Sequence, residues 1–293
     1  MSRATRTLAS GIHFGEGPRW RDGRLWFSDF VAHAVNSVSL DGDLRTEFVI
    51  GDQPSGLGWM PDGSMLIVSM TKRQVLRRTV AGAFSIHTDL NHIATFHCND
   101  MVVGASGEAF VGNFGFDLMH EMRVHGAERA RANHQTAQLA YVAPNGETRA
   151  VASDMHFPNG MVITPDEKTL IVAETMSGSL TACNIGGGGA LSDRRVWAAT
   201  FPRVPDGIAL DADGNIWIAN PRAPECARIA PAGDVLEVID TGQPCYACML
   251  GGGDGRTLFM LTAPPLNAAM DPAAPPAGQL LVADVETPHA GHP

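Results

Sequence analysis

One short pattern occurs six times in the sequence, and this repetition constrains the fold more than any other feature. Its clearest copy runs from Pro205 to Asn220, with an apolar run, then Asp213-Gly214, then a second apolar run that contains Trp217. An Asp-Gly pair between two apolar runs is a strong signal for a β-hairpin. The sequence therefore predicts the same hairpin six times.

The six copies follow one another at a nearly constant period. Aligned on the second residue of each copy, their spacings are 39, 44, 60, 47 and 40 residues, measured between Gly17, Gly56, Asp100, Gly160, Gly207 and Ala247. A period near 40 with four strands per repeat is typical of propeller blades. We therefore predict an all-β protein, a six-bladed β-propeller with four antiparallel strands per blade, as a single domain over residues 1–293.

The two ends of the chain have different expected roles. A short strand is predicted at residues 4–10, where it can supply the outer strand that the last blade, ending at 279–285, lacks. Closure of this kind leaves no long sheet edge exposed. The last eight residues, 286–293, are expected to form a disordered tail.

The spacing of 60 residues marks an insertion at residues 114–138, after the second strand of the third blade. The segment is charged and has helical character around 118–132. A lid over a neighbouring site and a plain surface loop are both consistent with it. Its histidines, His120, His125 and His134, are too irregularly spaced to indicate a metal site.

The net charge of −10 and the lack of a basic stripe argue against nucleic acid or an anionic membrane as a partner. No apolar run reaches the roughly 18 residues needed to span a bilayer. Residues 1–10 lack the apolar core of a secretory signal, so a cytoplasmic location is the default expectation. The expected partner is a small molecule, and the sequence does not indicate an oligomeric state.

The residue that opens each copy is polar in all six. Equivalent positions in a radial array face one axis, so these residues should form a ring around the central channel. The six are Glu16, Ser55, Asn99, Asn159, Asp206 and Tyr246. Polar residues at strand starts also bond loop backbone. Six convergent positions that include two carboxylates nevertheless favour a functional site.

Glu16, Asn159 and Asp206 offer two carboxylates and one amide oxygen. A set of oxygen ligands without Cys or His favours one hard or borderline divalent ion, such as Ca²⁺, Mg²⁺, Mn²⁺ or Zn²⁺. Three protein ligands would leave coordination positions for water and substrate, as a catalytic metal requires.

Four short motifs spread over the chain resemble the senescence marker protein (regucalcin)/gluconolactonase family of six-bladed propellers. They are Glu16-Gly17-Pro18, Asn99-Asp100, Pro158-Asn159-Gly160 and Pro205-Asp206-Gly207. The resemblance implies a divalent metal held by Glu16, Asn159 and Asp206, with Asn99 contacting substrate or metal-bound water, and it implies lactone hydrolysis with Asp206 as general base. The chemistry agrees, since a cation would polarise the lactone carbonyl and Asp206 could take a proton from the attacking water.

The sequence also departs from the sugar-lactonase members of that family. They carry Arg two residues before the position of Asn99, where this chain has His97, and a carboxylate where this chain runs into Asn113 and Phe114. These changes favour a less polar lactone or a related ester as substrate. His97, Asn99, Asn113, Phe114 and His156 are the candidate substrate contacts; for His97 and His156 the alternative is a rim histidine bonded to backbone.

Two other functions stay open at this point. One is a non-catalytic calcium-binding regulator, which the family resemblance also allows. The other is a metal-independent enzyme like strictosidine synthase, and the presence of both Glu16 and Asp206 speaks against it.

Overall fold

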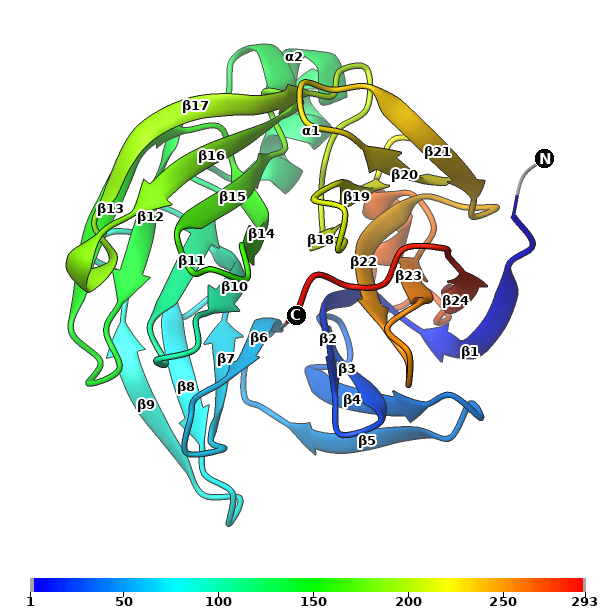
Figure 1. Ribbon diagram of the computed structural model, residues 1–293, viewed down its shortest axis with the longest axis horizontal. Coiled ribbons are helices and arrows are strands. Elements are labelled where there is room, and N and C mark those ends of the chain that lie inside the picture. The colour runs from blue at the N-terminus through cyan, green and yellow to red at the C-terminus, as the bar shows by residue number, and fades with distance from the viewer. Residues whose placement is uncertain (1–2, 292–293) are drawn as a thin grey trace.

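The computed structural model describes residues 3–291 and confirms the six-bladed β-propeller. Six four-stranded antiparallel sheets surround a central space (Figure 1). The first strand of each blade is innermost, because these strands contact one another from blade to blade around the ring.

The first three blades each use four consecutive strands. These are β2 (Gly15–Arg21), β3 (Arg24–Asp29), β4 (Ala34–Ser39) and β5 (Leu44–Val49); β6 (Pro54–Trp59), β7 (Met65–Ser69), β8 (Gln74–Arg78) and β9 (Phe84–Asp89); and β10 (Cys98–Val103), β11 (Ala109–Asn113), β12 (Ala137–Val142) and β13 (Thr148–Met155).

Blades four and five follow the same plan, and blade six combines both parts of the chain. The strands are β14 (Pro158–Ile163), β15 (Thr169–Glu174), β16 (Ser179–Ile185) and β17 (Leu191–Ala199); β18 (Ile208–Leu210), β19 (Ile216–Asn220), β20 (Glu225–Ile229) and β21 (Val235–Asp240); and β22 (Cys245–Gly251), β23 (Thr257–Thr262), β24 (Gly278–Asp284) and β1 (Arg6–Ile12).

The N-terminal strand closes the last blade, as the sequence predicts. β1 pairs antiparallel with β24, with Arg6 opposite Val282 and Ile12 opposite Gly278. The observed strand begins two residues after the predicted start at 4 and extends to Ile12. Its pairing covers the edge that β24 would otherwise expose.

Glycine at the second position of the repeat has a steric cause. A Cβ atom there would overlap the backbone of the neighbouring inner strand. The closest approaches would be 2.8 Å at Gly17 (to Ser55 O), 2.3 Å at Gly56 (to Met101 N), 2.5 Å at Gly160 (to Asp206 O) and 2.7 Å at Gly207 (to Ala247 Cα). The inner strands therefore pack backbone to backbone, and this brings the residues that open each copy close together.

Large apolar side chains fill the space between the blades. Phe27, Phe110, Trp217 and Phe259 are fully buried, one each from blades one, three, five and six. They alternate along their strands with residues that face the other side of the sheet, as expected for sheets packed on both faces.

The insertion forms two short helices, α1 (Leu118–His125) and α2 (Ala127–Ala132), in the region where helical character is predicted. Asp117 caps α1, since its Oδ1 accepts a hydrogen bond from the His120 backbone N–H at 2.9 Å. Two shorter helical turns lie in other loops: α3 (Leu266–Ala269) between β23 and β24, and the 3₁₀ turn η1 (Gly187–Gly189) before β17.

The prediction of a disordered tail is wrong for residues 286–291, and residues 292–293 lie outside the described part of the chain. The tail is held by backbone hydrogen bonds to blades five and six. Ala212 N donates to Pro288 O (2.8 Å), His289 N to Gly255 O (3.0 Å) and Ala290 N to Leu210 O (3.1 Å). Figure 1 shows this segment running from blade six to the centre of the ring. None of the helices found in residues 3–291 has the length and apolar character to cross a membrane.

We expect Gly160→Ala to destabilise the fold by about 1–3 kcal/mol, because the added methyl must displace the backbone around Asp206. Denaturant unfolding checks this. Gly253→Ala is the matched control, since nothing lies within 4 Å of a Cβ there. Equal stability of the two variants would contradict the steric account.

Candidate active site

All six residues predicted to form the ring are buried, and all lie at or just before the start of an inner strand. Glu16 and Asp206 are 5% and 7% exposed. Because the inner strands run in the same direction along the channel, their starts meet at one mouth. We call these residues (Glu16, Ser55, Asn99, Asn159, Asp206 and Tyr246) the polar ring.

Side-chain hydrogen bonds connect four members of the polar ring. Ser55 Oγ donates to Asn99 Oδ1 at 3.2 Å, and Asn99 Nδ2 donates to Asn159 Oδ1 at 2.8 Å. Asn159 Nδ2 in turn donates to Asp206 Oδ1. The chain of donors thus runs from blade two to blade five and ends on a carboxylate.

The two carboxylates of the polar ring repel each other and a third one. Burial raises the pKa of Glu16 well above its usual range, and the negative charges of Asp206 and Asp100 raise it further. Burial also raises the pKa of Asp206, with Asp100 adding to the shift and the hydrogen bond from Asn159 opposing it. The polar ring therefore holds negative charge at a high electrostatic cost.

Two further charged residues lie near the polar ring, Asp100 and its partner Arg19, and no pattern in the sequence predicted their pairing. Both are buried, and Arg19 Nη2 lies 3.4 Å from Asp100 Oδ1. Arg19 Nη1 also donates to Pro18 O at 2.7 Å. Burial raises the pKa of Asp100, and Arg19 opposes that rise. The sequence feature that could have singled out Asp100 is its place in the repeat, since four other copies have glycine at that position.

The charges in this region do not balance within the protein. Three buried carboxylates face one guanidinium, and among residues 3–291 no cationic side chain lies within ion-pair distance of Glu16 or Asp206. The excess of two negative charges and the oxygen-only donors fit a hard divalent cation. No three His, Cys, Asp or Glu side chains of the described residues are arranged to hold a metal, so a cation here would depend on the Asn159 amide oxygen.

Tyr246 differs from the other members of the polar ring. Its hydroxyl donates to Pro264 O at 3.0 Å, and its ring centroid lies 4.5 Å from that of Phe14. Burial raises the pKa of the phenol, and the charges of Asp206 and Glu16 raise it further. Tyr246 is thus a neutral hydrogen-bond donor and part of an aromatic cluster.

Two predicted substrate contacts, His97 and Phe114, lie next to each other. Phe114 N donates to the His97 carbonyl oxygen at 3.0 Å, and the Phe114 ring stacks on Phe157 at 4.3 Å. The His97 ring stacks on Phe96 at 4.1 Å, and burial lowers the pKa of His97. These residues form an aromatic rim at the entrances to blades three and four.

Asn113 and His156 have defined partners in the protein. Asn113 Nδ2 donates to Gln138 O at 2.7 Å and its Oδ1 accepts from Gly115 N at 3.0 Å, so the side chain holds the two ends of the insertion together. Its contact with substrate stays a prediction. His156 Nδ1 lies 2.7 Å from Nε2 of His134, a residue of the insertion.

An apolar cluster covers this side of the molecule. Phe116, Leu118, Phe157 and Met176 form its buried part, and Phe114, Met122 and Leu266 pack against it. Leu266 belongs to α3 in blade six, whereas the others come from blades three and four. Segments from opposite sides of the ring therefore meet, and we call these seven residues the apolar roof.

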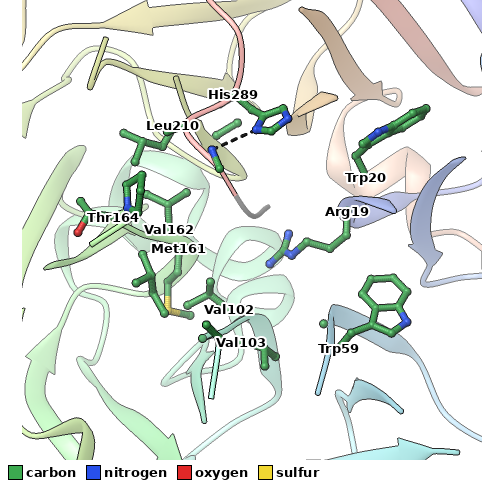
Figure 2. A pocket seen from close by; sticks show the side chains of 18 of the residues that line it. Arg19, Trp20, Trp59, Val102, Val103, Met161, Val162, Thr164, Leu210 and His289 are labelled. Carbon is green, nitrogen blue, oxygen red and sulfur yellow. Dashed lines mark hydrogen bonds between the residues drawn. The ribbon is translucent and has the colours of Figure 1, made fainter. Parts of the chain in front are cut away.

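A cavity of about 370 Å³ lies at the other mouth of the channel. Its lining comes from the ends of the inner strands and from the tail, including Trp20, Trp59, Met161 and His289. Figure 2 shows the Arg19 guanidinium pointing toward the middle of this cavity. Arg19 thus lies between the cavity and Asp100, and the cavity is separate from the polar ring.

The fold and this site define a six-bladed propeller with an acidic, amide-lined ring at one mouth of its channel. Residues 14–264 match the family model described as the SMP-30/Gluconolactonase/LRE-like region, and the chain belongs to this family. This confirms the resemblance drawn from the sequence motifs.

Individual relatives are distant but cover most of the chain. A gluconolactonase from Zymomonas mobilis is 24% identical, over 89% of this chain and 79% of that protein. An L-arabinolactonase from Azospirillum brasilense is 26% identical, over 94% and 89%. The structure of regucalcin, a calcium-binding protein from Agrobacterium tumefaciens, shares the fold with a TM-score of 0.80 at 19% identity, over 99% of this chain and 97% of that one.

We expect Asp206→Asn to stabilise the cation-free protein at neutral pH by about 1–2 kcal/mol, because it removes one of the repelling carboxylates and can keep the bond from Asn159. Because the folded-state pKa of Asp206 is raised, the wild-type penalty sets in as the pH rises above the unfolded-state pKa and is complete above the folded-state pKa. The advantage of the variant should therefore vanish on acidification. Thermal unfolding across pH measures this, and a pH-independent difference would contradict it.

Proposed function

We propose that the protein is a divalent-metal-dependent hydrolase that opens lactones or related esters. Glu16, Asn159 and Asp206 would hold the ion, and Asp206 would act as general base. The observation that carries the proposal is that Glu16 and Asp206 are both buried and that, among residues 3–291, neither forms an ion pair with a cationic side chain. The amide side chains of Asn99 and Asn159 form a hydrogen-bond chain that ends on Asp206. Gluconolactonase and L-arabinolactonase among the relatives support the reaction class.

The residues of the polar ring suit the steps of ester hydrolysis. A bound cation would polarise the substrate carbonyl and stabilise negative charge on its oxygen. As water attacks the carbonyl carbon, Asp206 takes its proton, a role that suits a carboxylate whose pKa burial has raised. The ring C–O bond then breaks, and the proton held by Asp206 passes to the departing oxygen, which regenerates the base and gives a hydroxy acid. Asn99 would orient the water or the substrate, and its hydrogen bond to Asn159 supports this role.

The surroundings of the polar ring favour a substrate less polar than a sugar lactone. The aromatic rim of His97, Phe114 and Phe157 and the apolar roof offer few hydrogen-bonding groups for several hydroxyls. We therefore assign the substrate contacts to His97, Phe114 and His156, with an apolar part of the substrate against Phe114.

The insertion would act as a lid in this proposal. It contributes Phe116, Leu118 and Met122 to the apolar roof and meets Leu266 of blade six there. A substrate that enters from this mouth would have to separate these contacts. The packing of the roof supports a lid over a plain surface loop.

Lactone hydrolysis should require a divalent cation and both carboxylates. Glu16→Gln and Asp206→Asn should each lower kcat/KM by about 10²–10⁴-fold, because each substitution removes a carboxylate ligand of the cation. Asp206→Asn removes the general base as well. The measurement is a panel of sugar and alkyl lactones with Ca²⁺, Mg²⁺, Mn²⁺ or Zn²⁺ after chelation, with the exposed Asp41→Asn as control. Turnover that survives chelation would rule out a requirement for a metal ion. Cation binding without turnover of any lactone or ester would favour a non-catalytic calcium-binding regulator.

A cation that binds the polar ring should raise Tm by about 5 °C at neutral pH and saturating concentration. The shift should fade as the pH falls, because Glu16 and Asp206 have raised pKa values and protonation competes with the cation. Differential scanning fluorimetry with and without chelator tests this. An equal shift in Glu16→Gln would place the cation elsewhere.

A further inference from the structure

His134 and His156 form a hydrogen-bonded pair beside the polar ring. His134 lies in the insertion, after α2, and His156 comes three residues before Asn159. His134 Nε2 and His156 Nδ1 are 2.7 Å apart, and His134 Nδ1 lies 2.7 Å from the carbonyl oxygen of Arg131. The pair therefore links the insertion to the entrance of blade four.

These contacts determine where the protons are in the neutral pair. A carbonyl oxygen only accepts, so Nδ1 of His134 must carry the proton and donate it to Arg131 O. Burial lowers the pKa of His134, which keeps its ring neutral. Its Nε2 is then an acceptor, and His156 must donate to it from Nδ1. The remaining ring nitrogen, His156 Nε2, is left as a bare acceptor.

His156 Nε2 has no hydrogen-bond partner among residues 3–291, and the ring is half-buried. The carboxylate that contacts the His156 backbone, Glu174, is already engaged. Its Oε2 accepts from the His156 backbone N–H at 2.7 Å, and its Oε1 accepts from Arg194 Nη2 at 3.1 Å. The bare nitrogen is thus free to meet a ligand.

We propose that His156 Nε2 accepts a hydrogen bond from a hydroxyl or amide N–H of the substrate, and that His134 is the positioning residue that keeps it an acceptor. This inference rests on the proposed function and narrows its substrate class. The preferred lactone carries an apolar portion, which lies against Phe114 and Phe157, and a hydrogen-bond donor, which meets His156. Sugar lactones have donors but lack the apolar portion.

NMR of ¹⁵N-histidine-labelled protein tests the proton positions without any substrate. We expect a bare Nε2 and a protonated Nδ1 at His156 in the wild type and in His134→Gln, because a glutamine amide can donate to Arg131 O and accept from His156. In His134→Phe the acceptor for His156 Nδ1 is lost, so both neutral tautomers of His156 should be populated. A protonated Nε2 in the neutral wild-type ring would overturn the inference, whether or not lactones are hydrolysed.

Kinetics test the selectivity with two probes, γ-butyrolactone with a ring hydroxyl and γ-butyrolactone without one. Wild type and His134→Gln should prefer the hydroxylated probe by about tenfold in kcat/KM, and His134→Phe and His156→Phe should lose that preference. His120→Phe, an exposed histidine of the same insertion, is the matched control. Hydrolysis of both probes with no preference in the wild type would overturn the inference and leave the proposed function intact.

If neither probe is hydrolysed, the proposed function fails for these lactones, and the same spectra still decide the inference. Addition of the hydroxylated probe should then shift the His156 Nε2 resonance in the wild type more than the plain probe does. Equal shifts of the His156 Nε2 resonance with the two probes would overturn the inference.

Discussion

The close approach of the six inner strands is the constraint on which the rest of the structure depends. At Gly56 a Cβ would lie 2.3 Å from the backbone of the next blade, and at Gly160 it would lie 2.5 Å from Asp206 O. Such contacts bring strand starts from different blades within hydrogen-bonding distance. The chain of side-chain bonds from Ser55 through Asn99 and Asn159 to Asp206 is a direct result.

That geometry also concentrates negative charge. Glu16, Asp100 and Asp206 are buried in one region, and in the described part of the chain Arg19 pairs with Asp100 while the other two have no cationic partner. Buried charges without partners are costly, so an arrangement of this kind is kept where a bound cation or a reaction uses it. If the proposed function holds, the same side chains would lower the stability of the cation-free protein and raise its affinity for a cation.

The repeat made the fold and the polar ring predictable, because both follow from equivalent positions in equivalent blades. The partner of Asp100 was not predictable, since Arg19 belongs to another blade and no period relates the two. His134 was noticed in the sequence only as one of several irregular histidines. Its contact with His156 depends on how the insertion folds back, which no local pattern encodes. The tail was expected to be disordered because the last residues of a domain are commonly poorly ordered, whereas backbone groups of blades five and six hold residues 286–291.

The last blade takes three strands from the end of the chain and one from its beginning, and this has a consequence for biosynthesis. Arg6 pairs with Val282, so the ring can close only after β24 has been made. Such distant pairing is slow, since a long loop must be ordered first. During translation the partner of β1 is therefore made only after the strands of blades one to five, and until β24 leaves the ribosome these blades can form only an open arc.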